Sequence, residues 1–181
     1  MMLNIDNTVM LLVDVQGQLA QLMHEKETFF RNLSTMVQGM KILDIPIIWM
    51  EQIPSKLGRT TEQIATLMPE AASPVEKFSF SCCGEPEFMT RFEALGRQQI
   101  LITGIEAHIC VFQTGMDLMA KGCEVHVAAD CVSSRTRENK DIGLDRLNNA
   151  GAVITSVEMA FFELLKAAQG DAFKQVVKLI K

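Results

Sequence analysis

The chain has 181 residues, and 48% of them are hydrophobic, which is enough for one domain (residues 1–181) with a substantial core. The net charge of −5, with Lys and Arg scattered along the chain, argues against nucleic acid or an anionic membrane as a partner. No apolar run approaches the roughly 18 residues of a membrane span, and residues 1–6 lack the basic start of a signal peptide, so we expect a soluble, unprocessed protein.

The first part of the chain alternates strand and helix patterns. Residues 8–14 form a short, continuously apolar run that ends in the carboxylate of Asp14, which is typical of a strand covered on both faces. Apolar residues at helical spacing predict a helix over 27–43, and residues 45–50 then resume a strand. Residues 51–80 carry three prolines and one glycine and predict a long loop with a short helix at 62–67. Such long loops in a compact domain are usually functional.

The same alternation continues to the end of the chain. Strands are predicted at 99–103, 124–129 and 152–156, and helices at 86–96, 110–121, 137–150, 158–167 and 171–180. Apolar strands joined by helices favour right-handed crossovers and a parallel sheet. The sequence therefore predicts an α/β fold, a three-layer α/β/α sandwich around a mostly parallel central sheet.

Five cysteines occur in the chain, an odd number, and no two of them form a C-x-x-C pair. A chain of this length folds without disulfides, so we expect free thiols and a cytoplasmic location. The default role of each thiol is that of a small buried hydrophobe. Any one of them needs a further feature before it is assigned chemistry.

Ligands of such folds bind at the carboxyl ends of the strands, and there Cys110 has the required further feature. It stands where a turn begun by Gly104 leads into a helix, so unpaired N–H groups and the helix dipole should lower the pKa of its thiol. The same N–H groups could stabilise an oxyanion. On position alone, a buried structural cysteine explains the pattern equally well, and we favour that interpretation for the other four cysteines.

Asp14 and Lys77 each have an ordinary explanation as well. Asp14 could cap the turn after its strand, and Lys77, in the loop segment 74–80, could be a solvated surface lysine. In a shared apolar cleft, however, the carboxylate could accept the Cys110 proton and the ammonium could orient the carboxylate and hold the thiolate. The three residues would then act like other sets of nucleophile, base and orienting group.

Four segments, in this order, resemble the isochorismatase-like family of cysteine hydrolases, which includes nicotinamidases, carbamoylsarcosine amidases and members without an assigned substrate. They are residues 11–16, 76–80, 104–114 and 127–135. The resemblance implies the isochorismatase-like hydrolase fold, with Asp14 as base, Lys77 as its partner and Cys110 as nucleophile. It also implies an oxyanion hole from the backbone N–H groups of Glu106 and Cys110, a cis peptide between Ile105 and Glu106, and a homo-oligomer, a dimer or larger.

The chain departs from the nicotinamidase pattern where that group carries an Asp-x-His metal motif. Here the place reads Glu51-Gln52-Ile53-Pro54, and the three histidines of the chain are too scattered for a convincing metal site. We therefore expect no metal and no cofactor. Segment 49–60 is closer to isochorismatase-domain proteins of unassigned substrate, and true isochorismatases cleave a vinyl ether without a cysteine nucleophile.

These observations predict a hydrolase that cleaves a C–N bond of a small-molecule amide, imide or carbamoyl compound through a Cys110 thioester. Two alternatives stay open: a catalytically silent binding or redox-sensitive scaffold protein, and an ester or vinyl-ether hydrolase without covalent catalysis. The direction of the Glu106 side chain, toward the pocket or a subunit interface, is also open. The residues expected to line the pocket are Gln16, Leu19, Trp49, Gln52 and His108.

Overall fold

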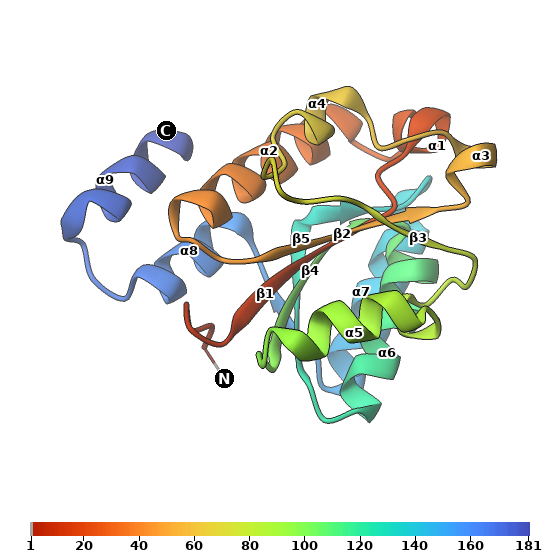
Figure 1. Cartoon of the computed structure of the whole chain (residues 1–181). Coiled ribbons are helices and arrows are strands. Elements are labelled where there is room, and N and C mark those ends of the chain that lie inside the picture. The colour runs from red at the N-terminus through yellow and green to blue at the C-terminus, as the bar shows by residue number, and fades with distance from the viewer. Residues whose placement is uncertain (1) are drawn as a thin grey trace.

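The computed structural model describes residues 2–181, which form a six-stranded parallel sheet with helices on both faces (Figure 1). The strand order is β3-β2-β1-β4-β5-β6. The strands are β1 (Thr8–Val13), β2 (Ile47–Gln52), β3 (Val75–Lys77), β4 (Gln99–Ile105), β5 (Glu124–Ser133) and β6 (Val153–Thr155). The predicted three-layer α/β/α architecture is confirmed.

The two strands at the centre of the sheet are buried along their whole length. β1 pairs with β2 on one side and with β4 on the other, so both of its faces and both of its edges are covered. Its side chains alternate between the two layers: Met10 and Leu12 join one apolar cluster, while Val9, Leu11 and Val13 join the other. A continuously apolar strand is what two covered faces require.

Each face of the sheet is covered by its own set of helices, as Figure 1 shows. One set is α1 (Gly17–Gln21), α2 (Lys26–Ile42), α4 (Glu62–Ala65), α8 (Val157–Leu165) and α9 (Gly170–Leu179). The opposite set is α5 (Pro86–Ala94), α6 (Phe112–Ala120) and α7 (Arg137–Ala150). Within residues 2–181, no helix has the length and apolar character needed to cross a membrane.

The structure differs from the sequence-based elements mainly in the segment expected to be a loop. Residues 51–80 contain the edge strand β3 and the short helix α3 (Pro54–Leu57) besides α4. β3 has only three residues, which is too short for a period to be recognised. The five-residue helix α1 was not predicted for the same reason. β5 extends beyond the predicted strand to Ser133, and its register with β4 shifts between Ile102 and Gly104.

Candidate active site

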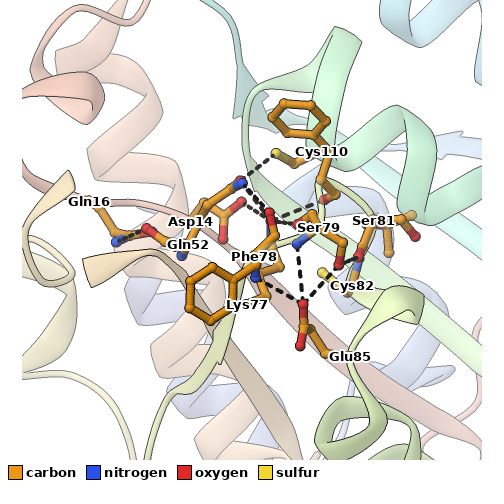
Figure 2. Close-up of polar contacts among 12 residues, drawn as sticks. Asp14, Gln16, Gln52, Lys77, Phe78, Ser79, Ser81, Cys82, Glu85 and Cys110 are labelled. Carbon is orange, nitrogen blue, oxygen red and sulfur yellow. Dashed lines mark hydrogen bonds and ion pairs between the residues drawn. The ribbon is translucent and has the colours of Figure 1, made fainter. Parts of the chain in front are cut away.

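Three neighbouring strands and the segment after β4 bring their polar residues to one edge of the sheet. Asp14 follows β1, Gln52 ends β2, Lys77 ends β3, and Cys110 lies five residues beyond β4. All strands of the sheet run in parallel, so their carboxyl ends meet at this edge. Figure 2 shows the four side chains converging there.

Asp14 and Lys77 form an ion pair that is shielded from solvent. The Lys77 Nζ lies 2.7 Å from Asp14 Oδ2, and the two side chains are 0% and 4% exposed. Lys77 Nζ also donates hydrogen bonds of 3.0 Å to the backbone oxygens of Ser79 and Phe80. The ammonium is therefore held from several directions, which is what a buried charge requires.

Gln52 connects this ion pair to the thiol. Its Oε1 accepts hydrogen bonds from Lys77 Nζ at 3.0 Å and from Cys110 Sγ at 3.3 Å, while its Nε2 donates to the Phe78 carbonyl at 3.1 Å. Among the described residues, Asp14 Oδ1 is buried and has no hydrogen-bond partner. A carboxylate oxygen in that state is available to take a proton.

Cys110 is carried by a turn that differs from the predicted helix start. Residues Ala107–Val111 form a π-helical turn, and the regular helix α6 begins only after it. Short π-helical stretches often occur at functional sites. The peptide bond between Ile105 and Glu106 is cis, which is where the family resemblance places one.

Two close backbone approaches fix the position of this turn. A Cβ on Gly104, whose φ is +108°, would stand 2.0 Å from the Val13 carbonyl oxygen on the neighbouring strand. A Cβ on Gly143 of α7 would stand 2.7 Å from the Ala107 carbonyl oxygen. Only glycine allows β1 and α7 to approach the segment this closely.

The acidity of the Cys110 thiol is the reverse of what the sequence predicted. Burial, followed by the negative charge of Asp14, raises the pKa of Cys110 to about 12, although Lys77 acts against this. The expected lowering is wrong because the thiol is 7% exposed and lies inside the π-helical turn, beside a carboxylate. The resting thiol is therefore protonated at neutral pH.

The pKa values of Asp14 and Lys77 are both raised. Burial raises the pKa of Asp14 above its usual value, although Lys77 pulls it down. Burial alone would lower the pKa of Lys77, but the Asp14 carboxylate and the Cys110 thiol outweigh it and raise the pKa. Lys77 therefore stays charged, while the proton affinity of Asp14 is increased.

A cavity of about 200 Å³ opens onto the thiol. Its walls are mainly apolar. The lining residues are Asp14, Leu19, Gln52, Ile53, Lys56, Leu57, Phe80, Ile105, Glu106, Ile109 and Cys110. Of the residues expected to line the pocket, Leu19 and Gln52 do so.

The other three expected lining residues lie elsewhere. Gln16 is fully buried and uses its amide to bind the backbone of Gln52 and Gly58. Trp49 points from β2 into the layer of α2, where its Nε1 donates to Thr60 Oγ1 at 2.7 Å. His108 Nδ1 lies 3.0 Å from Ser134 Oγ at the end of β5. All three support the site from behind its walls.

Glu106 lines the cavity, which answers the question left open by the sequence. Its Oε2 accepts hydrogen bonds from the Arg135 backbone N at 3.0 Å and from Arg135 Nε at 3.1 Å. The carboxylate is thereby neutralised at the wall. The sequence does not reveal this pairing, because Glu106 and Arg135 are 29 positions apart; Arg135 stands there only as the last residue of the matching segment 127–135.

The backbone beside the cavity adopts sparsely populated conformations. Asp14 has a φ of +52° and Ile53 a φ of +38°. Aspartate tolerates the left-handed region, but a β-branched residue there is an outlier. Such conformations cluster at functional sites, where surrounding structure holds them.

The segment after β2 is held down by a buried carboxylate. Glu51 is 1% exposed, and its Oε1 accepts from the Thr60 backbone N and Oγ1 at 2.7 and 2.8 Å. Its Oε2 pairs with Arg59 at 2.9 Å. The stretch between them includes Lys56 and Leu57 of the cavity wall, so this pairing positions part of that wall.

Residues 2–181 contain no group of three or more His, Cys, Asp or Glu side chains arranged to hold a metal ion. At the place of the nicotinamidase metal motif, Gln52 instead accepts hydrogen bonds from Lys77 and Cys110. Gln52 thus belongs to the core of the site rather than only to its wall. Its position at the end of a central strand was the signal for this role.

Comparisons with known proteins show the family of the chain. A family model described as "Isochorismatase domain" matches residues 8–159. The secreted isochorismatase effector Isc1 of Phytophthora sojae is 37% identical over 178 residues, covering 97% of this chain and 85% of the relative.

Two solved structures superpose over nearly the whole chain. The MAR1 ribonuclease from Caenorhabditis elegans has a TM-score of 0.94 and 30% identity, covering 99% of this chain and 92% of that one. The YcaC gene product of Escherichia coli, an octameric hydrolase of unknown specificity, has a TM-score of 0.92 and 20% identity. That superposition covers 98% of this chain and 90% of the Escherichia coli chain.

Proposed function

Because the chain belongs to the isochorismatase family, whose members are generally hydrolases, we propose that it hydrolyses a small-molecule amide, imide or carbamoyl C–N bond through a Cys110 thioester. The observation that carries the proposal is the Gln52 amide oxygen, which accepts from both Lys77 and Cys110 next to the Asp14 carboxylate. A candidate nucleophile, base and orienting cation thus lie in contact, with Asp14 and Cys110 lining one cavity and Lys77 buried behind it.

The first half of the reaction forms the thioester. Asp14 takes the Cys110 proton as the sulfur attacks the carbonyl carbon, and Lys77 stabilises the thiolate that develops. The backbone N–H groups of Glu106 and Cys110 bind the oxyanion. When the intermediate collapses, the C–N bond breaks and Asp14 returns the proton to the leaving nitrogen, so ammonia or an amine departs.

The second half regenerates the enzyme. Asp14 removes a proton from a water molecule, and the resulting hydroxide attacks the thioester carbon. The C–S bond breaks, the carboxylic acid leaves and the proton returns to the Cys110 sulfur. In sum, one water is consumed for each C–N bond that is broken, and the thiol of high pKa is ionised only during turnover.

The test is ammonia release from a panel of small primary amides and imides. We expect release from wild-type protein, a burst of ammonia where the thioester accumulates, and no release from Cys110→Ala. Hydrolysis that survives Cys110→Ala would contradict the covalent route and favour non-covalent ester or ether chemistry. An absence of release from every compound, with Cys110 still open to alkylation, would favour the silent scaffold.

We also propose that the partners are small molecules and further copies of this chain. The name of the worm protein assigns a ribonuclease activity to that protein. Here the apolar cavity walls and the net charge of −5 favour a small neutral ligand over a polyanion. The octameric state of the Escherichia coli protein supports a homo-oligomer, and five free thiols support a reducing, cytoplasmic setting.

A further inference from the structure

The wall of the cavity is built almost entirely from hydrocarbon. Six apolar side chains line it, contributed by four separate parts of the chain. They are Leu19, Ile53, Leu57, Phe80, Ile105 and Ile109. A surface of this kind rewards the burial of an apolar group and penalises a polar group that finds no partner.

The charges around this wall are already committed to one another. Asp14 is paired with Lys77 at 2.7 Å, and Glu106 is paired with Arg135 at 3.1 Å. Lys56, also among the lining residues, is solvent-exposed, so its ammonium keeps contact with water. A carboxylate on the ligand would lose its hydration on entering the cavity. It would find no unpaired, buried cation there to compensate for that loss.

The size of the cavity sets the second limit. At about 200 Å³ it lies below the roughly 300–1,000 Å³ of ordinary ligand pockets. Part of this volume is needed for the reacting amide group beside Cys110. The remainder suits a short branched chain or a single ring.

We propose that the substrate is a small primary amide whose acyl group is a compact, uncharged hydrocarbon. That acyl group packs against these six side chains. The inference rests on the proposed hydrolase function for the chemical step, but the selection of neutral apolar ligands follows from the cavity itself. Isobutyramide and benzamide represent the favoured class. Succinamic acid, which carries a free carboxylate beside its amide, represents the rejected class.

The first measurement compares kcat/KM for ammonia release from isobutyramide, benzamide and succinamic acid. We expect the two apolar amides to exceed succinamic acid by about tenfold or more, the discrimination that one buried group usually provides. If succinamic acid is hydrolysed as fast as the apolar amides, the substrate class is wrong while the hydrolase proposal stands.

The second measurement needs no turnover. Cys110 is alkylated with iodoacetamide, N-benzyl iodoacetamide and iodoacetate, and each rate is divided by the rate of the same reagent with glutathione. We expect the benzyl reagent to be fastest and the anion slowest on this scale. If the alkylation rates follow this order but no amide releases ammonia, the proposed ligand class stands and the hydrolase function is contradicted. Equal normalised rates would instead contradict the ligand class.

A matched pair of variants ties the preference to the wall. Leu57 lines the cavity and Leu95 lies outside it, and both are 37% exposed, so Arg is tolerated at either place. Leu57→Arg should shift both measurements toward the anion by about tenfold, since a guanidinium at the cavity wall can pair with it. Leu95→Arg should leave them unchanged. An unchanged preference in Leu57→Arg would contradict the assignment of this wall.

Discussion

Asp14 and Lys77 act on the Cys110 thiol in opposite directions. Asp14 raises the pKa of the thiol, whereas Lys77 lowers it. In the proposed mechanism, the carboxylate that serves as the base during turnover therefore suppresses ionisation of the resting thiol. Such an arrangement keeps the thiol unreactive until a substrate carbonyl is present to accept the developing negative charge.

Because of these opposed effects, Asp14→Asn should raise the alkylation rate of Cys110 and lower the rate of turnover. Alkylation of Cys110 by iodoacetamide should become faster by about tenfold, because a neighbouring charge typically shifts a pKa by one to three units. Turnover should fall by about 10²–10⁴-fold, because the general base is lost. The measurement is mass-mapped labelling beside ammonia release at pH 7.5, and slower labelling of Asp14→Asn would contradict it.

The wild-type protein supplies the control for this experiment. Its thiol pKa is raised to about 12, so the rate of Cys110 alkylation should climb with each unit of pH above neutrality. In Asp14→Asn the Lys77 ammonium still has the Gln52, Ser79 and Phe80 oxygens within 3.0 Å. The variant should therefore still fold, at a lower melting temperature because the buried ammonium loses its carboxylate, and a cooperative melt above the assay temperature would establish this.

At the scale of elements, the position of the proposed nucleophile Cys110 depends on contacts that its own helix does not make. The π-helical turn Ala107–Val111 packs against α7, and Gly143 is the point where helix and turn meet. A side chain there has no flexible neighbour to displace, because the nearest atoms belong to the backbone of Ala107 and His108. The turn itself would have to move.

Gly143→Ala should therefore impair chemistry more than stability. A displacement of about 1 Å at the nucleophile can cost on the order of a hundredfold in rate, so we expect a loss of about 10–100-fold in kcat/KM. The matched control is Gly115→Ala on α6, whose Cβ would meet the far end of the Leu147 side chain instead of backbone. If both variants lose activity in proportion to their loss in melting temperature, Gly143 has no special positioning role.

Across the whole molecule, the sequence was sufficient for features that depend on local patterns. Buried central strands and their connecting helices follow from periodicity, and the places of Asp14 and Cys110 follow from the ends of those strands. Lys77 was expected in a loop, because the three-residue strand β3 that carries it is too short to be recognised. The acidity of Cys110 could not be predicted, because it depends on burial and on a carboxylate 96 positions away. Likewise, the direction of the Trp49 side chain, toward the α2 layer and away from the cavity, depends on the register of β2.

The outer surface leads to the last prediction, that the protein is at least a dimer in solution. Phe78 is 75% exposed, and Phe80 of the cavity wall, two positions along the chain, is 54% exposed. Neighbouring exposed apolar side chains usually mark an interaction surface. Light scattering should give a multiple of 20.2 kDa, and Phe78→Asp should lower that mass. The charged control Leu95→Asp should leave it unchanged. A single-chain mass at every protein concentration would contradict the oligomer, whereas an unaffected mass in Phe78→Asp would move the interface away from Phe78 and Phe80.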